Sequence, residues 1–133
     1  MTSQPYSPGL NGVIAAEIGV SLLDTDLEMI IVRGYDLIEL AQNLNYTDVA
    51  YLVIYGVLPT EAQGREFCQS LAEQSEIPEE LYQLFEMMPK STVAMDALRT
   101  GISFLAGFED PELLNDNSRE ANLKKGIKLL AQV

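Results

Sequence analysis

The chain has 133 residues, 47% of them hydrophobic, so it is long enough to bury a core and too apolar to be a disordered protein. Its 20 acidic and 8 basic residues give a formal net charge of −12, which opposes binding to nucleic acid and to anionic membrane surfaces. It has no histidine and only one cysteine. This composition excludes zinc sites built from these residues and any nucleophilic mechanism that needs an imidazole base.

The single cysteine, Cys68, forms no disulfide within the chain, and the first residues lack the pattern of a secretory signal peptide. The apolar runs, such as 49–58, are shorter than the roughly 20 residues that cross a bilayer. These features predict a cytoplasmic protein without a membrane span.

Residues 1–35 are predicted to form an arm followed by a small β-hairpin. The first twelve residues contain several turn formers, namely Pro5, the Pro8-Gly9 pair and the Asn11-Gly12 pair. Short aliphatic runs at 18–23 and 29–32 flank the turn sequence at 24–26, as the two strands of a hairpin would.

Residues 36–133 are predicted to be helical. Asp36 has the character of an N-cap, with Glu39 at capping-box spacing, and Thr47 is the expected N-cap of a second helix that ends at Gly56. This second helix is apolar on nearly every face, which predicts that it lies inside a larger body. Thr60 and Gln63 form another capping box, here before an amphipathic helix.

Further helix signals follow toward the C-terminus. Pro78 is expected in the first turn of a helix that ends before Pro89, and Ser91 or Thr92 is expected to cap the next helix. That next helix, 95–108, is largely apolar and is the predicted central helix of the core. Its Gly101 and Gly107 are places where another helix can approach closely.

The last segments are a predicted loop at 109–117 and a helix that Ser118 caps. No glycine, proline or polar tail closes this last helix before Val133. We therefore expect the structure to continue beyond the chain.

Motifs for common cofactors are missing from the sequence. It has no G-x-G-x-x-G, no P-loop and no EF-hand loop. Two pairs of adjacent carboxylates, Glu79 with Glu80 and Glu109 with Asp110, are candidates for acid/base chemistry. Adjacent acidic residues at a helix start or in a loop are usually solvated or favour the helix dipole, and we prefer that interpretation here.

The other charged candidates also have two interpretations. Asp96 and Arg99, spaced i and i+3 near the start of an apolar helix, are either an ion pair that anchors the helix or, through Arg99, a substrate contact; the ion pair is preferred. Three lysines of the last helix either attract a phosphate or form a solvated face, which is preferred: Lys124, Lys125 and Lys128. Cys68 is expected to be a small core residue rather than a nucleophile.

Taken together, these segments resemble the bacterial citrate synthase and 2-methylcitrate synthase family along nearly the whole chain. The arm, with Tyr6-Ser7-Pro8-Gly9-Leu10 and Gly12-Val13-Ile14-Ala15, is similar to the N-terminal arm of that family. Val32-Arg33-Gly34-Tyr35-Asp36 resembles its R-G-Y stretch. The most specific stretch runs from Val49-Ala50-Tyr51-Leu52 to Tyr55-Gly56-Val57-Leu58-Pro59-Thr60. Met95-Asp96 with Leu98-Arg99-Thr100 resembles a third motif, where Val93-Ala94 replaces the usual His-Pro.

The resemblance implies a mainly α fold, the helical large-domain portion of a citrate-synthase-like fold with a small N-terminal β-hairpin. It implies a homodimeric enzyme without metal or other cofactor that condenses acetyl-CoA or propionyl-CoA with oxaloacetate. In such enzymes an aspartate removes a proton from the acyl group, while histidines stabilise the enolate and polarise oxaloacetate. The resemblance thus implies that residues 1–133 are the N-terminal part of the large helical domain and that the small domain and the catalytic segments lie outside this chain. We therefore assign it no catalytic, cofactor-binding or metal-binding residue.

Two functional hypotheses remain open at this stage. The first is an N-terminal, structural and dimer-forming fragment of such an enzyme, inactive by itself, whose partners are the rest of its own chain and a second subunit. The alternative is a stand-alone, non-catalytic interaction module derived from a truncated synthase gene. Preference between acetyl-CoA and propionyl-CoA is decided by a pocket outside this chain.

Overall fold

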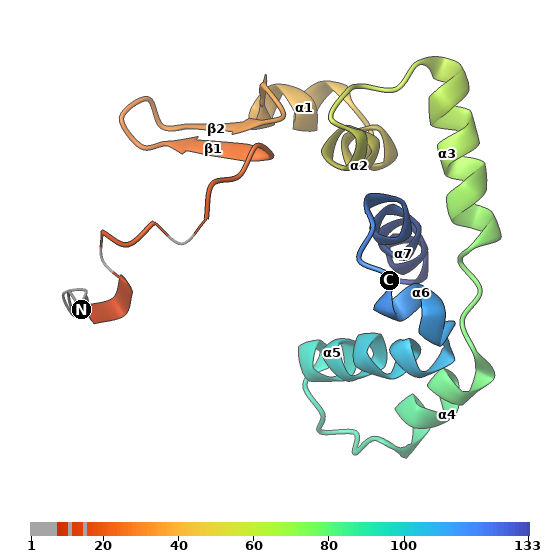
Figure 1. The fold of residues 1–133 in the computed structure, drawn as a ribbon. Coiled ribbons are helices and arrows are strands. Elements are labelled where there is room, and N and C mark those ends of the chain that lie inside the picture. The colour runs from red at the N-terminus through yellow and green to blue at the C-terminus, as the bar shows by residue number, and fades with distance from the viewer. Residues whose placement is uncertain (1–7, 11, 15) are drawn as a thin grey trace. The chain divides into compact units, whose positions relative to one another are not determined.

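The computed structural model describes residues 8–10, 12–14 and 16–133. The chain forms two compact units, Met1–Leu58 and Pro59–Val133, and each is considered by itself. Helices account for most of the described residues, and the strands form one small antiparallel sheet (Figure 1). The predicted fold class, mainly α with a small β-hairpin, is confirmed.

The sheet of the first unit consists of β1 (Ser21–Asp24), β2 (Met29–Val32) and β3 (Tyr35–Asp36), in that order. β1 pairs with β2 so that Leu23 lies opposite Ile30. At the turn, an Asp24 carboxylate oxygen accepts hydrogen bonds from the amides of Asp26 and Leu27 at 3.0 and 2.9 Å. The predicted hairpin is confirmed, and β3 extends it.

Part of the predicted arm falls within the described residues. Pro8–Leu10 form a short 3-10 turn, η1, with Gly9 in the left-handed region at φ 62°. The predictions for Pro5, Tyr6, Ser7, Asn11 and Ala15 lie outside the described residues, because residues 1–7, 11 and 15 are not among them.

The two helices of the first unit are α1 (Leu37–Asn43) and α2 (Tyr46–Tyr55). Asp36 caps α1 by accepting from the amides of Ile38 and Glu39, as predicted. The prediction of Thr47 as the cap of α2 is wrong. Asn45 holds the extended cap position and accepts from the Asp48 amide at 2.9 Å, while the Thr47 hydroxyl donates to Asn45 at 2.7 Å.

The end of α2 follows the prediction. Gly56 lies in the left-handed region at φ 84°, and its amide donates to the Leu52 carbonyl at 2.8 Å. Leu52 is fully buried. Other apolar side chains of α2 are only partly covered, so the predicted burial of the whole helix is not reached within these residues.

The second unit contains α3 (Glu61–Glu73), α4 (Glu79–Met87), α5 (Ala94–Leu105), η2 (Ala106–Phe108), α6 (Pro111–Asn115) and α7 (Arg119–Gln132). α3 packs against α7 and α4 against α5 (Figure 1). The buried side chains of this small core are Phe67, Leu81, Leu105 and Ala121. The Gln132 side chain also donates to the Glu76 carbonyl at 2.9 Å, which ties the end of α7 to the segment after α3.

The helix starts of this unit test several predictions. The capping box of α3 is confirmed, because Thr60 and Gln63 bond to each other's amides. Pro78 occupies the N-cap of α4, one position before the first turn where it was expected. The expectation of Ser91 or Thr92 as the cap of α5 is wrong: Val93 is the N-cap and no side chain bonds there.

The α5 segment ends in a different way from the prediction. The helix stops at Leu105 and continues as the 3-10 turn η2. A Cβ added at Gly101 would lie 2.7 Å from Phe85 Cζ, which confirms close approach of α4 there. Gly107 has no atom within 4 Å of an added Cβ, so that part of the prediction is wrong. Within this chain α5 is covered on one face, where Gly101 and Leu105 are buried, whereas Met95 at its start is 64% exposed.

The predicted loop at 109–117 contains a helix that the sequence interpretation missed. Asp110 caps α6 by accepting from the Glu112 amide at 2.9 Å, and Pro111 is the first helical residue. Ser118 then caps α7, accepting from the Ala121 amide at 3.2 Å as predicted.

Candidate functional site

The acidic candidates lie at separate places in the second unit. Glu79 and Glu80 are exposed in the first turn of α4, where carboxylates favour the helix dipole. Asp110 is the cap of α6. These three residues therefore have the structural roles that the preferred interpretation gave them. Glu109 differs, because its side chain is only 16% exposed and bonds to Lys128.

Asp96 and Arg99 form an exposed ion pair. Arg99 Nη1 lies 3.6 Å from an Asp96 carboxylate oxygen, and more than half of each side chain is exposed. This geometry fits the i, i+3 pair that was preferred over a substrate contact. Exposed pairs of this kind stabilise a helix only weakly.

The three lysines of α7 divide into two groups. Lys124 pairs with Glu120 at 2.9 Å on an exposed face, as the solvated interpretation expects. For the other two that interpretation is wrong. Lys125 Nζ donates to the carbonyls of Asp116 at 2.7 Å and Leu114 at 3.4 Å, and Lys128 bonds to the Glu109 carboxylate.

Electrostatics around the start of α7 follow from these contacts. Hydrogen bonds from Ser118 lower the pKa of the Asp116 carboxyl, and the positive charges of Lys125 and Lys124 act in the same direction. The Lys124 ammonium lowers the pKa of Glu120, and Glu120 in turn raises the pKa of Lys124. Each of these pKa shifts favours the charged form of the group, because the charged form makes the stronger hydrogen bonds and ion pairs.

Cys68 lies on α3 and is exposed, so its prediction as a core residue is wrong. On the same helix Phe67 fills the buried position. The apolar stripe of α3 is therefore narrower than the sequence periodicity indicated.

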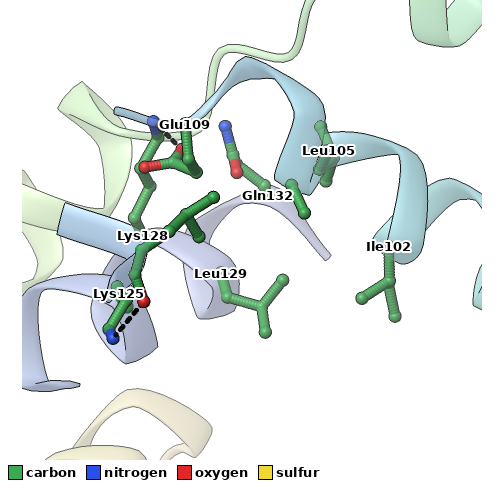
Figure 2. A pocket seen from close by; sticks show the side chains of 9 residues that line it. Ile102, Leu105, Glu109, Lys125, Lys128, Leu129 and Gln132 are labelled. Atoms are coloured by element: carbon green, nitrogen blue, oxygen red, sulfur yellow. Dashed lines mark hydrogen bonds and ion pairs between the residues drawn. The ribbon is translucent and has the colours of Figure 1, made fainter. Parts of the chain in front are cut away.

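An apolar pocket of about 160 Å³ lies in the second unit, among α5, η2, α6 and α7. Figure 2 shows Ile102 and Leu105 from α5 beside it, Leu129 from α7, and Lys128 bonded to Glu109 next to them. The remaining lining residues are Ala106, Leu114, Lys125 and Gln132. Sequence reasoning missed this pocket, because its walls come from positions up to 30 residues apart, Ile102 and Gln132.

The described part of the chain contains neither a metal-binding cluster nor a helix that could span a membrane. Within them, no group of three or more acidic, cysteine or histidine side chains is placed to hold a metal ion. A search of the same residues finds that every helix is too short or too polar to cross a membrane. In the second unit Asp110 caps a helix and Glu120 pairs with Lys124, while Glu109, Lys125 and Lys128 lie together at the pocket.

Comparison with known proteins identifies the family. The family model described as "Citrate synthase, C-terminal domain" matches residues 9–133. The chain belongs to the citrate synthase family. It is 39% identical over 133 residues to the citrate synthase of Heyndrickxia coagulans, covering all of this chain and 35% of that protein. It is 41% identical over 130 residues to the citrate/2-methylcitrate synthase of Bacillus subtilis, covering 98% of this chain and 34% of that protein.

A solved structure supports the same fold. The citrate synthase of Thermoplasma acidophilum, determined as a ternary complex with carboxymethyl coenzyme A and oxaloacetate, aligns with a TM-score of 0.87 at 18% identity. The alignment covers 98% of this chain and 34% of that one. The chain therefore spans about a third of the length of the citrate synthases that it matches.

Three of the four family-like stretches lie wholly within the described residues. The R-G-Y stretch forms the turn between β2 and β3, where Arg33 and Gly34 adopt positive φ values of 50° and 90°. The stretch from Val49 to Thr60 begins on α2, passes the cap residue Gly56 and ends at Thr60, the N-cap of α3. The third motif lies in the first turns of α5, after the exposed, extended N-cap Val93 and the first helical residue Ala94.

Proposed function

We propose that the chain is the N-terminal third of a cytoplasmic, homodimeric citrate-synthase-type enzyme. The parent enzyme condenses acetyl-CoA or propionyl-CoA with oxaloacetate and releases CoA with citrate or 2-methylcitrate. The observation that carries this proposal is the family match over residues 9–133 in a chain that spans about a third of its relatives. The family-like arm and hairpin at the start of the chain support the N-terminal position.

In this proposal the 133 residues are scaffold and subunit surface, and they are inactive alone. The condensation needs a base for the acyl proton and donors that stabilise the enolate. The sequence has no histidine to serve as such a donor. Among the described residues, Asp110 caps α6, whereas Asp96, Glu109 and Glu120 each pair with a nearby cation.

Exposed apolar side chains support a scaffold role. Helices of both units present large hydrophobic residues to solvent, namely Ile38, Tyr46, Tyr82, Met87, Met95 and Leu129. Monomeric proteins rarely leave so much apolar surface uncovered, and such surface marks contact with other protein. The remaining two thirds of a synthase and a second subunit supply that cover in the proposal.

A chimeric enzyme tests the proposal. This chain would replace the matching 130-residue stretch of the Bacillus subtilis citrate/2-methylcitrate synthase. We expect release of free CoA from acetyl-CoA or propionyl-CoA that depends on oxaloacetate, and none from the isolated chain. A chimera that is folded by circular dichroism but releases no CoA would count against the proposal, as would activity in the isolated chain.

The alternative, a stand-alone interaction module, draws on the same exposed apolar surface. It differs in needing only these 133 residues and a binding partner. An isolated chain that is folded and self-associates through this surface, with no longer product of its gene, would favour the module over the synthase fragment.

A further inference from the structure

The pocket of the second unit has an apolar interior and an open, apolar edge. Ile102, Leu105 and Ala106 provide one wall, and Leu114 and Leu129 another. Leu129 is 42% exposed and Leu114 is similarly accessible, so the pocket ends in hydrophobic surface that still faces solvent. Covering such surface releases about 25 cal/mol for each Å² of apolar area.

The charged groups at this pocket are already satisfied from within the chain. Lys128 bonds to Glu109, and Lys125 donates to two main-chain carbonyls. An occupant therefore has no unpaired charge to neutralise. A polar occupant would lose its own hydration without gaining strong partners, whereas an apolar one gains burial. The chemistry of the lining thus selects a hydrophobic side chain.

We propose that the pocket receives a large apolar side chain from the part of the parent enzyme beyond these 133 residues. This inference rests on the proposed function and adds the surface on which the missing part docks. The occupant follows from length: the chain spans 34% to 35% of its curated relatives, so about two thirds of the parent chain lies elsewhere and supplies most of the covering surface. Docking also buries the Glu109–Lys128 pair further, which a matched pair tolerates far better than a lone charge.

The test uses the protein expressed from its native gene. Leu129→Asp places a carboxylate in the docked pocket, and we expect it to lower the Tm by at least about 5 °C, while Leu129→Met lowers it by less than about 2 °C. Ser103→Asp, an exposed position on α5 outside the pocket lining, is the matched charge control and is expected to leave the Tm within about 1 °C. Should Leu129→Asp fail to fold, Leu129→Ala is expected to lower the Tm by about 3 °C or more.

The outcomes separate this inference from the proposed function. Oxaloacetate-dependent CoA release by the unmodified protein, together with equal Tm values for Leu129→Asp and Ser103→Asp, would overturn the docking site and leave the proposed function intact. A gene product of 14.7 kDa without CoA release would overturn both. If Leu129→Asp instead separated two subunits without lowering the Tm of each, the occupant would be a second copy, and the inference would be wrong.

Discussion

The Arg33 guanidinium binds the main-chain carbonyl of Val53 with two of its nitrogens, Nε at 3.1 Å and Nη2 at 2.8 Å. Val53 lies in the last turn of α2, where carbonyls have no partner within the helix. Nη1 of the same side chain donates to the Gly19 carbonyl at 3.3 Å. One arginine thus joins the turn after β2, the segment before β1 and the end of α2 within the first unit.

Replacing Arg33 by lysine is expected to weaken the end of α2. A lysine ammonium cannot form the two-nitrogen contact with one carbonyl, and loss of a partly buried, charge-assisted bond costs about 1 to 2 kcal/mol. Hydrogen exchange of the α2 amides measures this local stability. We expect exchange to be roughly 5 to 30 times faster in Arg33→Lys.

Arg65→Lys is the matched control for that substitution. Arg65 lies 3.7 Å from Glu61 with both side chains largely exposed, so the change is expected to alter stability by less than about 0.5 kcal/mol. Similar exchange rates in the two variants would show that the Arg33–Val53 contact contributes nothing specific.

Two glycine substitutions are expected to act in opposite directions. Gly101→Ala pushes a methyl group to 2.7 Å from Phe85 Cζ, and moving the ring is expected to cost about 1 to 3 kcal/mol. Gly126→Ala, in the interior of α7 with nothing within 4 Å, is expected to stabilise by about 0.5 to 1 kcal/mol. Urea unfolding followed by circular dichroism distinguishes the two. Stabilisation by both would contradict the close packing of α4 on α5.

The Glu109–Lys128 pair is expected to couple in a double-mutant cycle. Glu109→Gln, Lys128→Met and the double variant separate the pair interaction from the individual changes. Since Lys128 keeps 35% of its side chain exposed, the coupling free energy is expected to be only about 1 kcal/mol. Strictly additive effects on the free energy of unfolding would mean that the pair does not hold the η2–α6 segment to α7.

Stability is expected to depend on pH through Asp116. The Ser118 amide donates to an Asp116 carboxylate oxygen at 2.7 Å. This bond and a side-chain hydrogen bond from Ser118 hold the folded-state pKa of Asp116 below its usual value of 3.8. The carboxylate therefore stabilises the fold above pH 3.8, and this contribution is lost as the pH falls through the lower, folded-state pKa. Asp116→Asn keeps an acceptor oxygen but removes the charge.

We expect Asp116→Asn to be less stable than the unmodified chain at pH 7, with a difference that shrinks as the pH falls below 3.8. Urea midpoints at several pH values measure this. A difference that stays constant down to pH 2 would contradict the role of the Asp116 charge.

Local signals in the sequence were sufficient for many helix starts. Asp36, Thr60 and Ser118 act as caps because each needs only amides two or three residues away. Asn45 and Thr47 show the limit of such signals, since both have capping side chains and only the backbone conformation selects Asn45. The Asp110-Pro111 pair carried a readable start signal for α6 that the loop interpretation overlooked.

Contacts distant in sequence were not predictable from local pattern. Lys128 reaches Glu109 across 19 residues, and Lys125 reaches Leu114 across 11, so their roles depend on how α6 and α7 pack. The burial of α5 was overestimated for the same reason. The apolar pattern of α5 indicates a covered helix, but cover for Met95 is absent from the described residues of this chain. The apolar pattern of a helix indicates which of its faces is covered by protein. It does not indicate which part of the protein covers that face.

The intact mass of the protein produced from its native gene tests the central claim most directly. Since the chain spans 34% to 35% of its curated relatives, the account predicts a product about three times heavier than the 14.7 kDa of these residues. That product is also expected to release CoA in the presence of oxaloacetate. A product of 14.7 kDa would contradict the synthase account and favour the interaction module.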